Sequence, residues 1–508
     1  MMDVHQFTAS PVTCIVSFIV IYFVLLGTYR ILFHPLRHYP GPLLAKLSGL
    51  YGVFYACRTD LHRQTLKDHS RFGPIIRQGP NKLVFNSTRA LHDIYLSNRI
   101  TKSQSYLISQ RAPGVYGVFN AVDKQLHQTK RKLVGKVVNE TSLRGIEPII
   151  HSQIDIFIEQ LSLSKGSGSF NMTKMFKYLT NDIMGHVAFS YPFDLQTDAT
   201  HGYYIADTGK ANYLFNIAIQ LPALAIFNAP LFLPLRTLIR GKGYLKILET
   251  AIRHRISHDP QGKQDLLYMT DTMRVSDDDE TSMTEIENEA VFFLSAGSDT
   301  LSTTLSALFH YLSVNQRCYQ RLSHEIRSTF TDASEIRSGP VLASCRYLRA
   351  CIDETLRMCP PVPGTLWRQG MLGTASSPLS IEGHYIPPGT EIGVNTYALH
   401  HNAEYFPEPF VFKPERWLPG GAAANPTAKA AFIPFSVGPR ACVGKAMAYL
   451  EASLVVAKTM WYYDFERISG PREGFVDRGG QDGGVYPIGD MLVASHDGPY
   501  LRFQSLRG

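Results

Sequence analysis

Cys442 stands in a glycine-rich turn directly before a helical pattern, in the stretch FIPFSVGPRACVGKAMAYLEAS (residues 432–453). Such a turn constrains the fold, because it places a thiol at a helix start, where backbone N–H groups and the helix dipole stabilise a thiolate. Gly438 and Gly444 permit the backbone angles and the close approach that a flat ligand requires. Arg440 can pair with an anionic group nearby. The turn therefore favours a thiolate presented to a ligand, although a lone cysteine in such a loop is more often a small buried apolar residue.

The other cysteines and the overall charge exclude several classes of protein. Seven cysteines are scattered through the chain, and no CxxC spacing occurs. This argues against a disulfide framework or a zinc site and for a reducing compartment. The net charge of +7 is modest, and no basic stripe alternates with aromatic residues, so nucleic-acid binding is not expected.

An uncharged segment near the N-terminus predicts a membrane anchor. Residues 12–29 carry no charge, and as a helix they would span about 27 Å, close to the thickness of a hydrocarbon core. A cleaved signal peptide is the alternative, but the segment lacks a basic n-region and a small-residue cleavage site. Basic residues follow the span, so the positive-inside rule places the rest of the chain in the cytosol.

The remaining chain reads as one unit. At about 150 residues per domain, 508 residues would suggest about three domains, but no linker or composition break follows residue 46. We therefore expect a lumenal tail (1–11), a transmembrane anchor (12–29), a proline-rich hinge (30–45) and a catalytic domain (46–508).

The spacing around Cys442 resembles a known signature. Phe435-x-x-Gly438-x-Arg440-x-Cys442-x-Gly444 matches the haem-binding signature of the cytochrome P450 family position for position. The resemblance implies that the Cys442 thiolate is the axial ligand of the iron of haem b. Such a thiolate pushes electron density onto the iron and favours O–O cleavage, and the family is the standard example of this effect.

A second motif lies in a long apolar helical pattern at residues 289–313. By itself the pattern predicts a buried helix, but a glycine and an acid in its middle are costly. The stretch from Ala296 through Gly297 and Asp299 to Thr300 resembles the oxygen-activation motif of the family. The resemblance implies that Gly297 makes room for dioxygen, that Thr300 hydrogen-bonds the bound oxygen and that Asp299 helps to deliver protons. A Thr300 hydroxyl bonded to the Ala296 carbonyl would also loosen the helix locally.

Two further sets of residues resemble motifs of the family. Glu354 and Arg357 would alone be an ordinary surface ion pair, but together with Arg416 they resemble a buried structural cluster that locks the region of the cysteine loop. Cations for the haem propionates are implied at His127 and Arg131, at Arg368 and at Arg440, and each of these could also be a solvated basic residue.

The resemblance covers nearly the whole chain after residue 30 and is strongest to fungal microsomal members. It implies a mainly α fold with a smaller β-rich lobe, and a monooxygenase of the endoplasmic reticulum membrane, single-pass, with a cytosolic catalytic domain. The resemblance implies that the enzyme uses O2 and receives electrons from NADPH-cytochrome P450 reductase, with cytochrome b5 as an alternative electron donor. It also implies a lipophilic substrate, and we expect this substrate to be a fungal secondary metabolite. A haem-thiolate isomerase or dehydratase and a non-catalytic haem sensor are the alternatives.

We also expect three functional surfaces: a substrate pocket, a membrane contact and a docking face for the reductase. The substrate pocket is expected to draw on residues 101–122, on the helix near Phe293 and Ala296, and on residues 362–366. The uncharged segment 214–235 contains three prolines and is expected to dip into the membrane interface, with a buried core segment as the alternative. Reductase docking is expected at Lys124, Lys130, Lys132 and Lys136.

Overall fold

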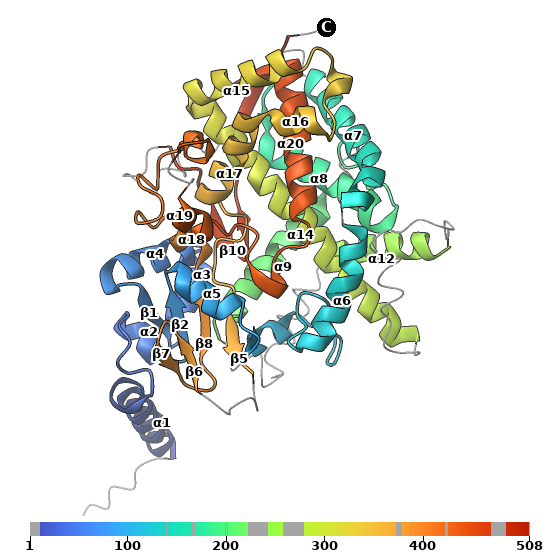
Figure 1. Ribbon diagram of the computed structural model, residues 1–508. Coiled ribbons are helices and arrows are strands. Elements are labelled where there is room, and N and C mark those ends of the chain that lie inside the picture. Colours follow the sequence, from blue (N-terminus) through green and yellow to red (C-terminus); the bar gives the residue numbers. More distant parts are fainter. Residues whose placement is uncertain are drawn as a thin grey trace, which may run out of the picture.

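The computed structural model describes residues 11–138, 140–163, 168–198, 200, 202–221, 242–257, 279–371, 378–421, 425–468 and 484–506. Helices form most of this part of the chain, and a smaller β-rich lobe lies on the side from which the N-terminal helix extends (Figure 1). The mainly α fold with a smaller β-rich lobe is therefore confirmed. From residue 222 onward, the uncharged segment 214–235 lies outside the described residues.

The helices of the body pack around one large apolar core. They are α6 (Lys124–Val137), α7 (Glu140–Ser162), α8 (Met172–Phe189), α9 (Tyr203–Ala218), α12 (Lys242–Ser257), α14 (Asp279–Val314), α15 (Gln316–Thr329), α16 (Pro340–Ser344), α17 (Arg346–Met358) and α20 (Lys445–Tyr462). Shorter helices lie near the β-rich lobe: α2 (Leu43–Leu47), α3 (Leu50–Cys57), α4 (Leu61–Phe72), α5 (Thr88–Tyr95), α18 (Thr396–His400) and α19 (Pro426–Ala431). The 3-10 turns are η2 (Gln104–Ser109), η5 (Ala333–Glu335), η6 (Pro414–Trp417) and η8 (Gly438–Arg440).

The β-rich lobe is centred on a five-stranded sheet in the order β1-β2-β8-β5-β3. Its strands are β1 (Ile75–Gly79), β2 (Lys82–Phe85), β8 (Glu391–Val394), β5 (Arg368–Gly370) and β3 (Ile100–Lys102). A three-stranded sheet contains β4 (Phe170–Asn171), β12 (Tyr500–Ser505) and β9 (Tyr463–Arg467), and two hairpins pair β6 (Leu379–Ile381) with β7 (His384–Ile386) and β10 (Gly489–Met491) with β11 (Val493–Ser495). The pairing of β3 with β5 and of β2 with β8 joins segments that are far apart in the sequence.

The N-terminal helix α1 (Pro11–Thr28) continues through one π-helical turn, η1 (Tyr29–Phe33). The segment Pro11–Phe33 is long and apolar enough to cross a membrane, and none of its most apolar window is buried. The helix therefore extends four residues beyond the expected end at Tyr29, and the proline-rich segment begins at His34. Buried Arg77 in β1 donates to the Arg30 carbonyl (2.9 Å), which fixes the end of this helix to the sheet.

Helix α14 passes through the core, although its middle is rich in serine and threonine. Most of the buried hydroxyl groups bond to the backbone of the same helix: Ser298 Oγ donates to the Leu294 carbonyl (2.6 Å) and Thr304 Oγ1 to the Thr300 carbonyl (3.0 Å). A buried hydroxyl that has a hydrogen-bond partner costs little free energy. The polar middle of α14 is therefore compatible with its central position.

Gly297 marks the crossing of α14 and α8. A Cβ at this position would lie 2.7 Å from Met184 Cε and 2.8 Å from Met184 Cγ. Carbon atoms normally pack at about 3.5–4.0 Å, so the thioether of Met184 occupies the space that any larger residue at 297 would need. The glycine thus sets how closely the two helices approach.

We expect Gly297→Ala to lower the thermal unfolding midpoint, because the displaced Met184 side chain costs about 1–3 kcal/mol, against a gain of at most about 1 kcal/mol in helix propensity. Gly135→Ala in α6 is the matched control, since no atom of the described chain lies within 4 Å of its Cβ position. This control should be at least as stable as the parent. Equal stability of the two variants would show that Met184 relaxes freely.

Candidate functional site

The Cys442 loop connects η8 with α20 and is closed by a backbone hydrogen bond from the Cys442 N–H to the Phe435 carbonyl (2.8 Å). Gly438 has a φ of +78°, and a Cβ there would collide with the Tyr95 carbonyl oxygen of α5. Glycine is therefore required at 438 both by its φ and by the close approach of α5. Gly444 has an ordinary φ of −81° and is the N-cap of α20, so its φ alone does not demand glycine.

The Cys442 side chain is exposed at the start of α20, so a ligand can reach its sulfur. Desolvation by the surrounding protein nevertheless raises the pKa of the thiol, while the Gly444 backbone hydrogen bond and the charges of Arg131 and Lys445 lower it. From the sequence we expected the start of the helix to lower the pKa of this thiol. In the protein without a ligand, desolvation outweighs that effect and the pKa is raised. A metal cation at the sulfur would reverse this balance, because a coordinating thiol is deprotonated.

Five basic side chains from four elements converge beside this loop and are called the basic cluster here: Lys102 of β3, His127 and Arg131 of α6, Arg368 of β5 and Arg440 of η8. Burial and the positive charges of the other four members lower the pKa of His127 to about 3. Burial and the charge of Arg368 lower the pKa of Arg440 to about 10. Each basic group of the cluster thus lies in the repulsive field of the others, and His127 is neutral at neutral pH.

The register of the sheet accounts for part of this repulsion. Lys102 of β3 is directly opposite Arg368 of β5, and like charges in such cross-strand pairs are destabilising. Burial, Arg368 and Arg440 together bring the pKa of Lys102 well below its ordinary value. In the described part of the chain, no carboxylate forms an ion pair with Lys102, Arg131, Arg368 or Arg440. The cluster therefore fits a ligand with more than one negative charge.

Backbone carbonyls orient the guanidinium groups of the cluster. Arg131 Nη1 donates to the Ala441 carbonyl (2.6 Å), next to Cys442. Arg440 donates to the carbonyls of Ala121 (2.7 Å) and Val122 (3.1 Å). A neutral carbonyl does not compensate the positive charge, so both side chains are fixed in place while their charge stays available. A reachable thiol beside such a cluster fits a haem, which offers an iron and two carboxylates.

Lys102 is the member of this cluster that sequence reasoning missed. It lies in a strand of three residues, ITK, without any motif around it. Its place follows only from the pairing of β3 with β5, which sets it opposite Arg368. The sequence carries no signal for this role, because the burial of the strand, which is unusual around a lysine, is seen only in the structure.

The acid and the hydroxyl of α14 occupy different surroundings. Thr300 Oγ1 donates to the Ala296 carbonyl (2.7 Å), the bond that the sequence predicts. Asp299 is buried, and its Oδ2 accepts from Ser295 Oγ (3.0 Å) and from Asn212 Nδ2 of α9 (3.4 Å). Burial raises the pKa of this carboxyl, against the opposing effects of Lys177 and the two hydrogen bonds. Asp299 can therefore hold a proton nearer to neutral pH than an exposed aspartate.

Gly297 needs no ligand to explain it. We expected this glycine to make room for dioxygen. The structure offers another reason for a glycine here, because its Cβ position faces Met184 of α8. Packing between the two helices accounts for a glycine at this position.

Glu354, Arg357 and Arg416 form the buried cluster that the sequence predicts. Arg357 binds Glu354 through two parallel hydrogen bonds of 2.9 Å, and Arg416 Nε donates to Glu354 Oε1 (3.2 Å). The Glu354 and Arg357 side chains are 0% exposed. Trp417 Nε1 (3.0 Å) and the Lys413 N–H (3.1 Å) donate to the same carboxylate. The carboxylate is therefore fully paired, and removing it would leave the buried charges of Arg357 and Arg416 without their counterion.

His400 connects this cluster to the chain that leads into the Cys442 loop. Arg357 Nη1 donates to the His400 carbonyl (3.0 Å), and His400 Nε2 accepts from the Ile433 N–H (2.9 Å). Burial and the Arg357 charge lower the pKa of His400 to about 3, so its imidazole is neutral and can accept this bond. The cluster thus acts on the loop through two hydrogen bonds in series.

Lys130 does not belong to a docking surface. It is buried and pairs with Glu289 of α14 at 3.1 Å, while Glu289 also accepts from the Val118 N–H (3.0 Å). The expectation of a docking role for Lys130 is therefore wrong, because its position on α6 faces α14. Lys132 and Lys136 are exposed on the same helix.

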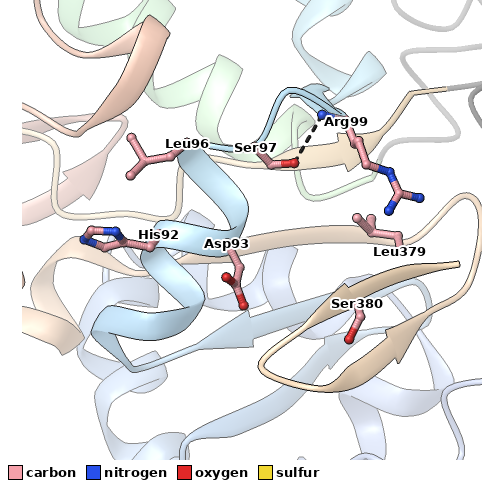
Figure 2. A pocket seen from close by; sticks show the side chains of 7 residues that line it. All are labelled: His92, Asp93, Leu96, Ser97, Arg99, Leu379 and Ser380. Atoms are coloured by element: carbon pink, nitrogen blue, oxygen red, sulfur yellow. Dashed lines mark hydrogen bonds between the residues drawn. The ribbon is translucent and has the colours of Figure 1, made fainter. Parts of the chain in front are cut away.

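Two of the hollows in the described part of the chain bear on where a substrate could bind. The larger, about 390 Å³, is an open depression between α5 and β6 (Figure 2). Its lining is polar, with His92, Asp93 and Arg99 among its residues, which does not suit a lipophilic substrate. The smaller is enclosed and borders Val362 and Leu366, but its volume is only about 20 Å³, so the contribution of residues 362–366 to a substrate pocket stays a prediction.

Comparison with known proteins gives a consistent result. The family model described as Cytochrome P450 matches residues 42–480. Cytochrome P450 monooxygenase poxM of Penicillium oxalicum is 32% identical over 97% of this chain and 95% of its own. Cytochrome P450 monooxygenase apf7 of Gibberella fujikuroi is 33% identical over 98% of this chain and 99% of its own. Cytochrome P450 monooxygenase AKT7 of Alternaria alternata is 32% identical over 97% of this chain and 98% of its own.

Glu354→Gln is expected to destabilise the protein by about 3–5 kcal/mol, because the variant leaves two buried guanidinium groups without their carboxylate. Urea unfolding followed by circular dichroism measures the change. Glu466→Gln makes the same substitution in the exposed pair with Arg502 and should cost at most about 1 kcal/mol. A loss at Glu354 no larger than that at Glu466 would contradict the structural role of the cluster.

Proposed function

Because the chain belongs to the cytochrome P450 family and is a haem monooxygenase of that family, we propose that it hydroxylates or otherwise oxidises a lipophilic small molecule, and that the Cys442 sulfur would bind the iron of the haem. The basic cluster beside a reachable thiol carries this proposal. The fungal origin of the three compared relatives supports a role in fungal secondary metabolism. When bound, the haem supplies the electron-transfer and oxygen chemistry of the reaction.

The residues of the chain divide the work of holding the haem. The Cys442 loop would present the sulfur, and Phe435, which packs on Tyr449 at 5.1 Å between ring centroids, supports the loop from the side of α20. The basic cluster would bind the two propionates. Loading then removes the repulsion between Lys102 and Arg368, so haem binding should also stabilise the sheet.

Proton supply is the second task of the chain. Thr300 Oγ1 is tied to the Ala296 carbonyl and offers its oxygen as an acceptor toward the site. Asp299 Oδ2, bonded to Ser295 Oγ, can hold a proton that a hydroxyl relay passes on. These groups favour a monooxygenase over an isomerase or dehydratase of the same family, which needs no proton delivery.

Electrons are proposed to come from NADPH through cytochrome P450 reductase, with cytochrome b5 as an alternative donor. Lys132 of α6 and Lys445 at the start of α20 are exposed, and Lys445 lies 5.8 Å from the ring centroid of Phe435 in the Cys442 loop. Positive charge on this side of the loop would attract an acidic partner.

Membrane attachment is proposed at the endoplasmic reticulum, with a single pass and a cytosolic catalytic domain. The helix Pro11–Phe33 supports the anchor. Large apolar side chains on α2 and α3 are also exposed: Leu43 (59%), Leu44 (69%), Leu50 (62%) and Phe54 (55%). An apolar surface next to the anchor suits contact with the bilayer interface.

Co-expression with a reductase tests the function. The parent enzyme should consume NADPH and oxidise at least one compound from a panel of terpenoids and aromatic polyketides. Cys442→Ala should lose both turnover and the red-shifted Soret band of the reduced CO complex, because it removes the thiolate. Cys57→Ala, an exposed cysteine on α3, should retain both. Product formation without NADPH would instead identify an isomerase, and haem binding without any turnover would identify a sensor.

Lys132→Glu combined with Lys445→Glu should slow reduction of the haem by the reductase. The defect should shrink as salt rises, because charge steering is screened beyond about 8 Å at physiological ionic strength. Stopped-flow reduction at low and high salt measures this. Lys67→Glu combined with Lys174→Glu, two exposed lysines on α4 and α8, changes the same amount of charge elsewhere and should reduce at the parental rate. Equal rates for all three proteins at low salt would place docking on another surface.

A further inference from the structure

The enclosed hollow is a narrow crevice between α9, the segment that leads into β5 and the hairpin β10–β11. Its cavity volume is about 20 Å³, close to the space that one water molecule occupies. Its lining includes Tyr106, Asn216, Gly364, Trp367, Asp490 and Leu492. Asp490 is the only charged residue among the described lining residues.

One oxygen of Asp490 is used by the protein and the other is not. Asp490 is buried, with 1% of its surface exposed. Its Oδ1 accepts from Asn216 Nδ2 (3.2 Å) and from the Leu492 N–H (3.2 Å). Its Oδ2 accepts no hydrogen bond from the described residues. A Cβ at Gly364 would lie 3.2 Å from this oxygen, so the missing side chain there keeps Oδ2 accessible.

Backbone strain points to the same place. Leu492 forms the one-residue tip of the hairpin with a φ of +73°, which is rare for a residue with a Cβ. Such strain collects at ligand clamps, where the surrounding structure enforces it. Here the Leu492 N–H is held by Asp490 Oδ1, so the strained tip fixes the direction of the carboxyl.

The crevice lies a short way from the catalytic helix. Asp490 is directly opposite Ala494 in the hairpin, about 5 Å away between Cα atoms, and the Ala494 carbonyl accepts from Thr303 Oγ1 of α14 (3.3 Å). Thr303 is three residues, about 4.5 Å of helix rise, from Thr300. The hairpin that carries Asp490 therefore contacts α14 within one helical turn of Thr300.

We propose that Asp490 Oδ2 anchors a protonated amine of the substrate, which identifies the substrate as a lipophilic amine held at its nitrogen. This inference rests on the proposed monooxygenase function. The crevice accommodates a head group the size of an ammonium, not the body of a substrate. A cation is the matching partner, because Oδ1 already receives two N–H donors and no basic side chain of the described residues forms an ion pair with Asp490. An amine would supply the missing countercharge.

The titration of this carboxyl gives the anchor a pH dependence. Burial raises the pKa of Asp490 to about 7, against the hydrogen bonds from Leu492 and Asn216, and the negative charge of Asp60 on the neighbouring segment raises it further. Tyr106 is the other titratable residue of the lining. The carboxylate form dominates only above pH 7, so amine binding should strengthen as the pH rises from 6 to 8, by about tenfold for a pKa of 7.

Equilibrium dialysis of the haem-loaded protein without NADPH tests the anchor. The probes are 4-phenylbutan-1-amine, its neutral isostere pentylbenzene, and 4-phenylbutan-1-ol. The parent should bind the amine about tenfold or more tighter than the hydrocarbon at pH 8, as a charge-assisted hydrogen bond provides. Asp490→Asn should lose this preference and its pH dependence, because the amide retains the acceptor for Leu492 but not the charge.

Asp497→Asn is the matched control, an exposed aspartate in the same C-terminal region outside the crevice, and it should behave as the parent. Retention of the CO-complex spectrum in each variant shows that the fold and the haem site are intact. Binding of the amine no tighter than the hydrocarbon, or tighter binding of the alcohol than of the amine, would overturn the proposal. Turnover with a reductase is measured separately, so a failed anchor and a failed monooxygenase function are distinguishable.

Discussion

The Glu354 carboxylate is the interaction on which the arrangement of the site depends. It accepts five N–H hydrogen bonds, two from Arg357 and one each from Arg416, Trp417 and the Lys413 backbone. These donors join α17 to η6, and the same Arg357 holds the His400 carbonyl of α18. Because His400 then accepts from the Ile433 N–H, the position of the chain entering the Cys442 loop follows from a carboxylate on a different helix.

The basic cluster has the opposite electrostatic character. Glu354 is fully compensated, whereas Lys102 and Arg368 are placed side by side without a carboxylate partner in the described chain. Burying like charges together costs free energy that a folded protein recovers only through an anionic ligand. Haem with its two carboxylates provides that compensation, so binding of the cofactor and stability of the sheet should be coupled.

Helix α14 shows how one helix combines packing with chemistry. Most of its buried hydroxyls, such as those of Ser298 and Thr304, serve only their own backbone. Asp299 differs, because its carboxylate is bonded to side chains of α14 and of α9 and its pKa is raised by burial. Gly297 belongs to the packing, since Met184 fills the space beside it. Residues of one contiguous motif therefore serve different tasks according to the direction in which each faces.

The sequence by itself determined the features that depend on local spacing. The anchor follows from a run of uncharged residues, the Cys442 loop from residues within one turn, and the Thr300–Ala296 bond from the geometry of a helix. The cluster of Glu354 could be predicted only because its spacing resembled a known family. In each case the residues are neighbours in the chain, or their spacing along the chain matches a pattern of known structure.

Only the tertiary structure decided which distant residues meet. Lys102 joins the basic cluster because β3 pairs with β5, and Lys130 is buried because α6 turns it toward Glu289 of α14. Asp490 is enclosed because the hairpin β10–β11 folds against Asn216 of α9. Burial and countercharge depend on what lies across a contact, and a single sequence specifies its own periodicity but not its neighbours in space.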